Sequence, residues 1–203
     1  PYWTEYSLME EVVRCSWPGT DPLMVKHHDE EWGVPCHDDR KLFEYIVLDT
    51  FQAGLSWAIV LKKRENFRRA FDNFDPNKIA NYGFKPILEL ENDASIIRNK
   101  LKIRATVSNA RAFLAIQKEF GSFDEYIWRF TGGQPIVNRH QKDSDIGATL
   151  PESDTISLDL KKRGLKFVGS TICYAFMQGA GLVNDHLVSC FRYAEVQKPT
   201  GNN

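Results

Sequence analysis

The stretch VNDHLVSC, residues 183–190, places His186 and Cys190 four positions apart near the C-terminal end of the chain. If this stretch is helical, both side chains project from one face on successive turns, because a helix turns once in about 3.6 residues. An imidazole and a thiol at this spacing can supply two ligands of a tetrahedral metal ion. The pair therefore predicts half of a metal site, and the alternative is an ordinary core cysteine beside a hydrogen-bonded histidine.

The other half of such a site would come from the segment CSWPGTDPLMVKHH, residues 15–28, in which twelve residues separate Cys15 from His28. With the first pair these residues would form a Cys2His2 zinc site that ties the two ends of the chain together. Four protein ligands leave no open position for water, so the site would be structural. The residues alone leave the ligand set open, because three neighbours could compete: His27, Cys36 and His37.

Length and composition set the class of protein. A chain of 203 residues with 42% hydrophobic content can bury a sizeable core, as one domain or as two closely packed lobes. The first fifteen residues have no basic start followed by an apolar run, and no window offers about 18 consecutive apolar residues. We therefore expect a cytoplasmic protein without a membrane span, whose four cysteines are free thiols or metal ligands.

The charge distribution leaves nucleic-acid binding open. A net charge of −1 excludes a uniformly cationic binder, but it can hide a polarised surface. Basic runs occur at residues 61–69, 98–104 and 160–166. Each run on its own is typical of a solvated helix face, whereas three runs that converge would form a phosphate-binding surface.

Helical periodicity dominates the first half of the chain. Residues 39–74 carry apolar side chains at helical spacing, and Gly54 is expected to separate two helices there. Asp75 is expected to cap the next helix, with Pro76 at its first position.

The second half of the chain continues the helical pattern. Residues 102–121 carry one apolar stripe that ends at Gly121, and residues 122–130 predict a short aromatic helix. The longest loop is expected at residues 131–155, after which a helix ends at Gly164. Strand alternation is nowhere sustained, so the sequence predicts an all-α protein without internal repeats.

Longer motifs in a fixed order carry a resemblance to a known family. They include HDEEWGVP (28–35), QAGLSW (52–57), LKKREN (61–66) and LKKRGLKFVGSTICYAFMQGAGLVNDHLVSC (160–190). The chain resembles the DNA-3-methyladenine glycosylase I family of the helix-hairpin-helix glycosylase superfamily. The resemblance covers residues 15–190 as one compact helical domain and leaves an N-terminal extension (1–14) and a C-terminal tail (191–203) outside it.

The resemblance implies an activity and a cofactor. Members hydrolyse the N-glycosidic bond of alkylated adenine in double-stranded DNA during base excision repair, and we expect a monofunctional, monomeric enzyme. The structural zinc ion of the family would be held by Cys15, His28, His186 and Cys190. Two alternatives remain: a damaged-base or nucleic-acid binding protein with altered specificity or lost turnover, and a zinc-stabilised interaction module.

The resemblance also implies a base pocket. Trp17, Trp32 and Trp57 match its aromatic residues, and Trp57 is expected to stack on the flipped base, although core packing is the commoner use of tryptophan. The pocket glutamate of the family falls on Asp49, the expected catalytic carboxylate, which is one methylene shorter.

Three further departures fall on the same pocket. Met24 and His27 stand where the family has tyrosines, and Phe51 brings a bulky apolar side chain near Asp49. Together with Asp49 they predict a different or larger modified base, or weakened discrimination.

The DNA-binding hairpin of the family would lie near residues 93–112. No glycine occurs between Gly83 and Gly121, so the turn must differ from the glycine-rich form. Asn99 can adopt a left-handed conformation, and three basic side chains can add charge, so we expect phosphate contacts from Asn99, Lys100, Lys102 and Arg104.

Overall fold

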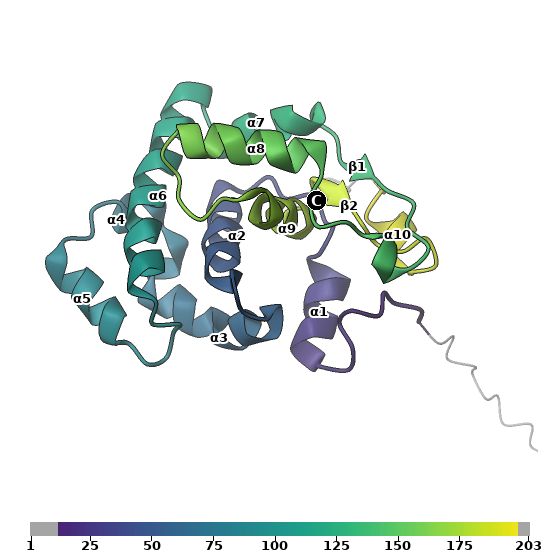
Figure 1. The fold of residues 1–203 in the computed structure, drawn as a ribbon, viewed down its shortest axis with the longest axis horizontal. Coiled ribbons are helices and arrows are strands. Elements are labelled where there is room, and N and C mark those ends of the chain that lie inside the picture. The colour runs from purple at the N-terminus through teal and green to yellow at the C-terminus, as the bar shows by residue number, and fades with distance from the viewer. Residues whose placement is uncertain (1–11, 199–203) are drawn as a thin grey trace, which may run out of the picture.

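A computed structural model describes residues 12–198 and shows a predominantly helical protein (Figure 1). Its helices α2 and α9 lie at the centre, with α6, α7 and α8 around them and the two described ends of the chain close together on the side of α1 and α10. The helices are α1 (Pro22–Glu30), α2 (Asp39–Gln52), α3 (Trp57–Ala70), α4 (Pro76–Ile79), α5 (Phe84–Asn92), α6 (Lys100–Phe120), α7 (Phe123–Trp128), α8 (Pro151–Lys162), α9 (Ser170–Gly179) and α10 (Arg192–Glu195). Short 3₁₀ turns are η1 (Asp72–Phe74), η2 (Arg129–Thr131) and η3 (Asp143–Asp145).

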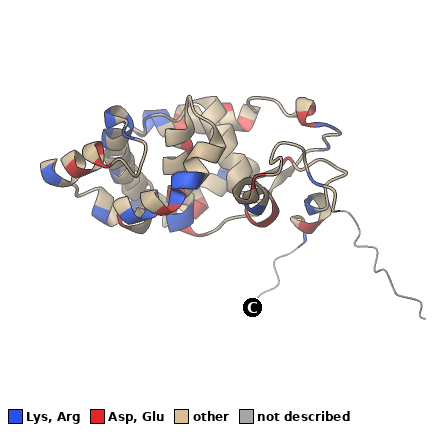
Figure 2. Cartoon of the chain, turned by 90° about the horizontal axis from the view of Figure 1, so that it is seen from below, with Lys and Arg blue, Asp and Glu red and all other residues tan. Residues whose placement is uncertain are grey.

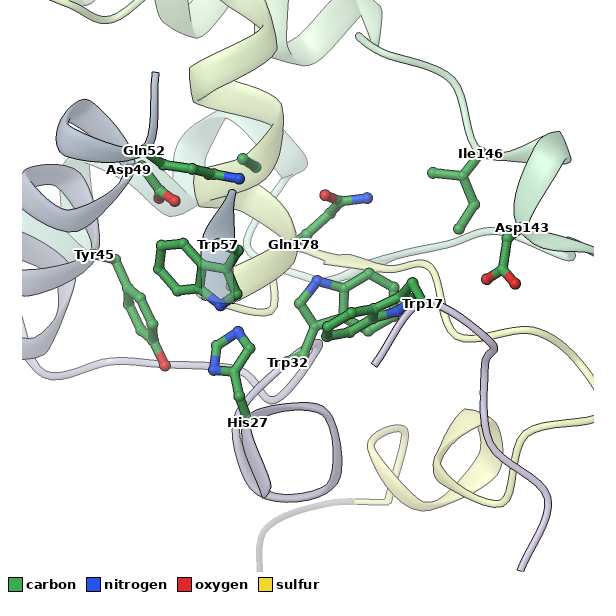
Figure 3. A pocket seen from close by; sticks show the side chains of 12 residues that line it. Trp17, His27, Trp32, Tyr45, Asp49, Gln52, Trp57, Asp143, Ile146 and Gln178 are labelled. Carbon is green, nitrogen blue, oxygen red and sulfur yellow. The ribbon is translucent and has the colours of Figure 1, made fainter. Parts of the chain in front are cut away.

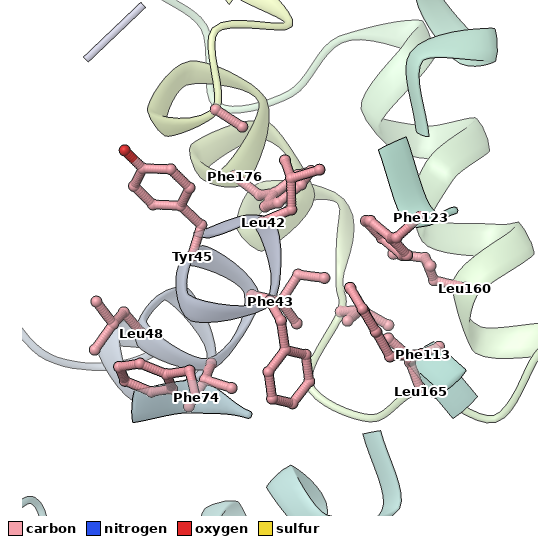
Figure 4. Close-up of a cluster of buried hydrophobic side chains, with 14 of the residues drawn as sticks. Leu42, Phe43, Tyr45, Leu48, Phe74, Phe113, Phe123, Leu160, Leu165 and Phe176 are labelled. Carbon is pink, nitrogen blue, oxygen red and sulfur yellow. The ribbon is translucent and has the colours of Figure 1, made fainter. Parts of the chain in front are cut away.

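The core is built around α2. Every residue from 42 to 51 is buried, because α3, α6, α7 and α9 all pack against this helix. Figure 4 shows Phe43, Leu48 and Phe113 in this cluster. A helix covered on all sides can bring a polar side chain far from solvent, and α2 does so at Asp49.

Several predicted boundaries are confirmed. Gly54 lies between α2 and α3 with φ +81°, and Gly121 ends α6 with φ +91°. The Asp75 carboxylate accepts a hydrogen bond from the backbone N–H of Asn77 at the start of α4, where Pro76 is the first residue. Local cap chemistry determines these boundaries, so the sequence predicts them well.

One prediction about chain conformation is wrong, and the predominantly helical fold contains one short strand pairing in addition. The loop expected at 131–155 already contains η3 and the start of α8 at Pro151. The fold is not strictly all-α, since β1 (Ile136–Val137) pairs in parallel with β2 (Val183–Asn184). That pairing extends the backbone before His186. Residues 183–190 therefore form a short strand followed by a turn, and they are not helical.

The two ends meet beside this pairing. The backbone N–H of Phe191 donates to the carbonyl of Val13 at 2.9 Å, and Arg14 forms a two-pronged ion pair with Asp29. The predicted domain limits at residues 15 and 190 stay a prediction, and most of the expected extension and the last five residues lie outside the described chain. Across residues 12–198, no helix has the length and apolar character needed to cross a bilayer.

Gly181 allows the turn between α9 and β2. Its φ is +73°, and a Cβ there would lie 2.2 Å from the backbone carbon of Val34. We expect Gly181→Ala to lower the free energy of unfolding by about 3 kcal/mol or more, because conformational strain adds to a backbone clash. Gly132→Ala is the matched control, with φ +67° but open space around it, and should cost about 1 kcal/mol. Urea unfolding of the two variants checks this, and equal losses would show that strain alone is responsible.

Candidate functional site

Four buried side chains from the two ends of the chain form a cluster of metal-ligand type. The ligand atoms of Cys15, His28, His186 and Cys190 all lie within 4.8 Å of one another. The competing neighbours are engaged elsewhere: His27 with Glu31, His37 with Asp124, and the Cys36 thiol with the carbonyl of Asp38. The structure therefore selects one of the ligand sets that the sequence left open.

The distances within the cluster fit a tetrahedral ion. Zinc with bonds of about 2.3 Å to sulfur and about 2.0–2.1 Å to nitrogen separates the two kinds of ligand by roughly 3.6 Å. The Cys190 sulfur lies 3.6 Å from His28 Nε2 and 3.6 Å from His186 Nδ1, and the Cys15 sulfur lies 3.8 Å from His186 Nδ1. These four residues could therefore hold a metal ion without rearrangement.

Outer hydrogen bonds orient both imidazoles. His186 Nε2 lies 2.8 Å from the carbonyl oxygen of Trp32, and His28 Nδ1 lies 2.7 Å from the Asp29 carboxylate. Each ring donates its N–H outward and so turns a lone pair toward the thiols, as in known metal sites. The pKa of the Cys190 thiol is lowered, mainly by a hydrogen bond with Cys15 and further by hydrogen bonds with His186 and His28. Burial raises this pKa but does not outweigh these contacts.

A cavity of about 340 Å³ lies beside this cluster. Its walls come from the N-terminal segment, from α2 and α3, from α9, and from the loop around η3 (Figure 3). Its volume is at the lower end of the range for small-molecule sites. The lining residues are Trp17, His27, Trp32, Tyr45, Asp49, Gln52, Trp57, Asp143, Ile146, Ala175, Gln178 and Gly179.

Asp49 is a buried carboxylate in the wall of the cavity. It shares one face of α2 with Tyr45 and Gln52, because residues at spacings of three and four align on a helix. Its side chain is 4% exposed, and its Oδ2 atom has no hydrogen-bond partner among the described residues. Burial raises the pKa of this carboxyl group well above its ordinary range.

His27 is held by a chain of charges behind the cavity wall. Its Nδ1 lies 2.7 Å from Glu31, which accepts from Arg64 at 2.7 Å, and Arg64 also donates to Glu44 at 2.6 Å. Burial lowers the pKa of His27, although the contact with Glu31 opposes this. Burial acts to raise the pKa of Glu31, but the hydrogen bonds from His27 and Arg64 hold it below its usual range.

Gln178 was not predicted from the sequence, yet its amide has a defined orientation. Its Nε2 donates at 2.9 Å to Asp185, whose buried carboxylate also accepts hydrogen bonds from Tyr174, Asn138 and His140. The Asp185 oxygens accept these hydrogen bonds, so the nitrogen of the Gln178 amide is the atom that faces Asp185. The amide oxygen is therefore free to accept from a ligand in the cavity.

Some predicted base-binding residues lie on the cavity and others do not. Trp17, His27, Trp32, Trp57 and Asp49 line it, and their roles toward a base stay predictions. Two residues expected there are placed elsewhere, namely Met24 and Phe51.

The physical reason differs for the two displaced residues. Phe51 follows Asp49 by two positions, which turns it about 200° around α2, so its ring packs in the core at 4.8 Å from Phe67. The expectation that it enters the pocket is wrong. Met24 is half-buried on α1 but does not line the cavity.

The residues expected to bind phosphate also differ in their exposure to solvent and in their contacts. Lys102 is 6% exposed, and its Nζ donates to the carbonyls of Phe51 and Ala53 near the end of α2, so its predicted role in DNA binding is wrong. Asn99 has φ −102° rather than a left-handed conformation, and its side chain caps α6. Lys100 and Arg104 remain accessible, although both are paired with Glu91.

The basic runs do not form an uninterrupted positive surface. In Figure 2, Lys and Arg segments alternate with Asp and Glu segments along the helices. Arg64 and Arg163 are engaged in ion pairs within the protein, whereas Lys161 and Lys166 are exposed. A phosphate-binding surface at these runs stays a prediction.

Comparison with known proteins agrees with the motifs. A model of the methyladenine glycosylase family matches residues 17–193. The chain belongs to this family. DNA-3-methyladenine glycosylase 1 of Escherichia coli (strain K12) is 50% identical over 182 residues, which are 90% of this chain and 97% of that protein. The corresponding glycosylase of Haemophilus influenzae is 46% identical and covers 88% of this chain and 97% of its own length.

Solved structures of methyladenine glycosylases share the fold. A crystal structure of 3-methyladenine DNA glycosylase I superposes with a TM-score of 0.86 at 50% identity, covering 88% of this chain and 98% of that chain. A Staphylococcus aureus structure, described as the basis of 3-methyladenine recognition, superposes with a TM-score of 0.85 at 33% identity, covering 87% and 94%. The family membership inferred from the motifs is thereby confirmed.

The burial of Asp49 makes its effect on stability depend on pH. Because the folded-state pKa is raised, the unfolded chain loses this proton first, and stability falls as pH rises from about 4 toward the folded pKa. We expect Asp49→Asn to be more stable than the wild type at pH 7.5 and nearly equal to it at pH 4. The difference should grow by about 1.4 kcal/mol per pH unit until the folded pKa is reached. Urea unfolding across this range measures it, and a variant less stable at pH 7.5 would contradict a desolvated Asp49.

Proposed function

We propose that the protein is a monofunctional DNA glycosylase that hydrolyses the N-glycosidic bond of N3-alkylated adenine in double-stranded DNA. The single observation that carries the proposal is the unpaired carboxylate of Asp49 inside an aromatic cavity. Relatives that cover nearly the whole chain are named DNA-3-methyladenine glycosylases, which supports the same reaction. We place the protein in the cytoplasm as a monomer.

The cavity suits a flat cation. An N3-alkylated adenine in DNA carries positive charge on its ring, and such rings stack favourably on electron-rich aromatic faces. Trp57 comes from α3, while Trp17 and Trp32 come from the N-terminal segment and meet edge to face with centroids 5.1 Å apart. We assign Trp57 the stacking position, because it lies on the same side of the cavity as Asp49 (Figure 3).

Asp49 would discriminate by charge. In a desolvated site an attraction between opposite charges is far stronger than in water. A cationic base would allow Asp49 to ionise and would offer its exocyclic amine as a donor, whereas neutral adenine would leave the carboxylate uncompensated. The alkylated base is therefore favoured over the far more abundant normal one.

The chemistry needs little further assistance. Water adds to C1′ of the deoxyribose, the bond between C1′ and N9 breaks, the bonding electrons leave with the base, and one water proton is released. The base departs neutral. We assign Asp49 the catalytic role of stabilising the positive base and sugar as this bond lengthens, and the free oxygen of Gln178 the role of an acceptor within the cavity.

Base release tests this function. Asp49→Asn should lower kcat/KM for release of free 3-methyladenine from methylated duplex DNA by about 100-fold, because the amide cannot supply the negative charge. Asp49→Glu restores the reach of the family carboxylate and should stay within about tenfold of the wild type. Glu89→Gln, at an exposed carboxylate on α5, is the control for surface charge. Wild-type protein that binds methylated DNA but releases no base would assign it to damage recognition instead.

We propose zinc as the ion at the Cys15, His28, His186 and Cys190 cluster, where it would act as a cross-link between the chain ends. Phosphate contacts from Lys100 and Arg104, with Asn99 at the start of α6, complete the proposal. Neither feature takes part in bond breaking.

Metal removal tests the cross-link. The purified protein should contain about one zinc per chain, and a chelator or Cys190→Ala should lower Tm by about 10 °C or more, because ion binding is coupled to folding. Cys36→Ala, at a buried cysteine outside the cluster, should retain the metal. Atomic emission and thermal unfolding provide the readouts. Metal-free protein whose Tm is unchanged by added zinc would contradict the assignment.

A further inference from the structure

The side of the cavity opposite Asp49 contains a second carboxylate that the proposed reaction does not use (Figure 3). Asp143 lies in η3, and its Oδ2 atom accepts hydrogen bonds from the backbone N–H and the hydroxyl of Ser16. These contacts fix the carboxylate against the N-terminal segment. Its other oxygen, Oδ1, is buried and has no hydrogen-bond partner among residues 12–198.

A donor without a partner lies on the Asp143 side of the cavity, farther from Asp49 than Trp57 is (Figure 3). The indole N–H of Trp17 is buried and also unpaired within the described chain. Leaving a donor and an acceptor buried without partners costs free energy, and native proteins keep few such atoms without a functional reason. The cavity at this end is therefore complementary to a group that both donates and accepts a hydrogen bond, which is the property of a hydroxyl.

The position of this pair relative to Asp49 indicates which part of the substrate reaches it. Figure 3 shows Asp49 on one side of the cavity and Asp143 on the other, with Trp57, Gln178 and Trp17 between them. In adenine, C6 and N3 are para to each other on the six-membered ring. A base that presents its C6 amine to Asp49 therefore directs its N3 substituent toward Asp143.

We infer that the end of the cavity formed by Trp17, Asp143 and Ile146 is a subsite for a hydroxyl-bearing N3 substituent, such as 2-hydroxyethyl. The hydroxyl donates to Asp143 Oδ1 and accepts from the Trp17 indole N–H, while Ile146 contacts the carbon atoms. The inference rests on the proposed function and names a substrate class for the same pocket. It also agrees with the larger modified base expected from His27 and Asp49, the two altered residues that line the cavity.

A comparison of three N3 substituents separates the effect of the hydroxyl group from the effect of substituent size. Duplex DNA is alkylated with methylating, ethylating and 2-hydroxyethylating agents, and the three samples are mixed. Free 3-alkyladenines released by the full-length protein are then separated by chromatography. We expect kcat/KM for the 2-hydroxyethyl base to exceed that for the ethyl base by about tenfold, the size of effect that hydrogen bonds to a charged group produce.

Variants near the subsite test the role of Asp143 through the ratio of kcat/KM for the hydroxyethyl base to kcat/KM for the ethyl base. In Asp143→Ala the preference for hydroxyethyl over ethyl should fall to about one, whatever the absolute rates, because both bases are measured in the same protein. Asp145→Asn changes a carboxylate in the same 3₁₀ turn that caps backbone N–H groups outside the cavity, and it should keep the preference. Circular dichroism establishes that both variants are folded.

The possible results separate the inference from the function on which it rests. A hydroxyethyl preference that is lost in Asp143→Ala and kept in Asp145→Asn supports the subsite. Equal release of ethyl and hydroxyethyl bases together with efficient 3-methyladenine release overturns the subsite and leaves the glycosylase intact. A preference that survives in Asp143→Ala also overturns it. No release of any 3-alkyladenine from DNA overturns the proposed function, and the subsite with it.

Discussion

The meeting of the chain ends at Cys15, His28, His186 and Cys190 is the contact on which the rest of the site depends. The N-terminal segment that supplies two of these ligands also supplies three walls of the cavity, Trp17, His27 and Trp32. His27 directly precedes a ligand, and the carbonyl of Trp32 orients another. The same segment is also fixed by backbone hydrogen bonds from Gly33 to Gln178 and from Cys36 to Ala180, and by the ion pair of Glu31 with Arg64. The meeting of the ends adds to these contacts, and a structural ion would restrain the N-terminal segment further by lowering its conformational entropy in the unbound protein.

Asp49 shows how the fold sets one carboxylate apart. The structure describes four buried carboxylates in residues 12–198, and three are compensated: Glu44 by Arg64 and Arg68, Glu91 by Arg104, and Asp185 by four hydrogen-bond donors. Asp49 has no such partner. A fold that satisfies its other buried acids so fully would not leave one destabilised without a gain elsewhere. The compensating charge is expected from the ligand, which makes binding of a cation and relief of this instability the same event.

The sequence predicts the features that depend on local chemistry. Asp75 and Gly121 delimit helices because caps act within a few residues, and His186 and Cys190 meet even though their stretch is not helical, because the turn after β2 also brings them together. The errors arise at residues whose contacts depend on which side of a helix the side chain faces. Phe51 and Lys102 lie in the segments expected to contact base and DNA, but their side chains face the core and the end of α2. Gln178 and Asp143 gain their positions only through tertiary contacts with Asp185 and Ser16, so no pattern in the chain could indicate them.

The rigidity of the wall opposite Asp49 follows from the charges behind it. Glu31 joins α1 to Arg64 on α3, and Arg64 joins α3 to Glu44 on α2, so the imidazole of His27 cannot turn without breaking hydrogen bonds that lie mostly out of solvent. Gln178 is restrained in the same way by Asp185. A pocket whose polar atoms are fixed before the ligand arrives spends little free energy on reorganisation, and it rejects bases whose donors and acceptors are misplaced. The difference between a methylated and an unmodified adenine is one methyl group and one charge. Because apolar contact with a methyl group discriminates only weakly, the proposed function requires this preorganised electrostatic environment to provide most of the selectivity.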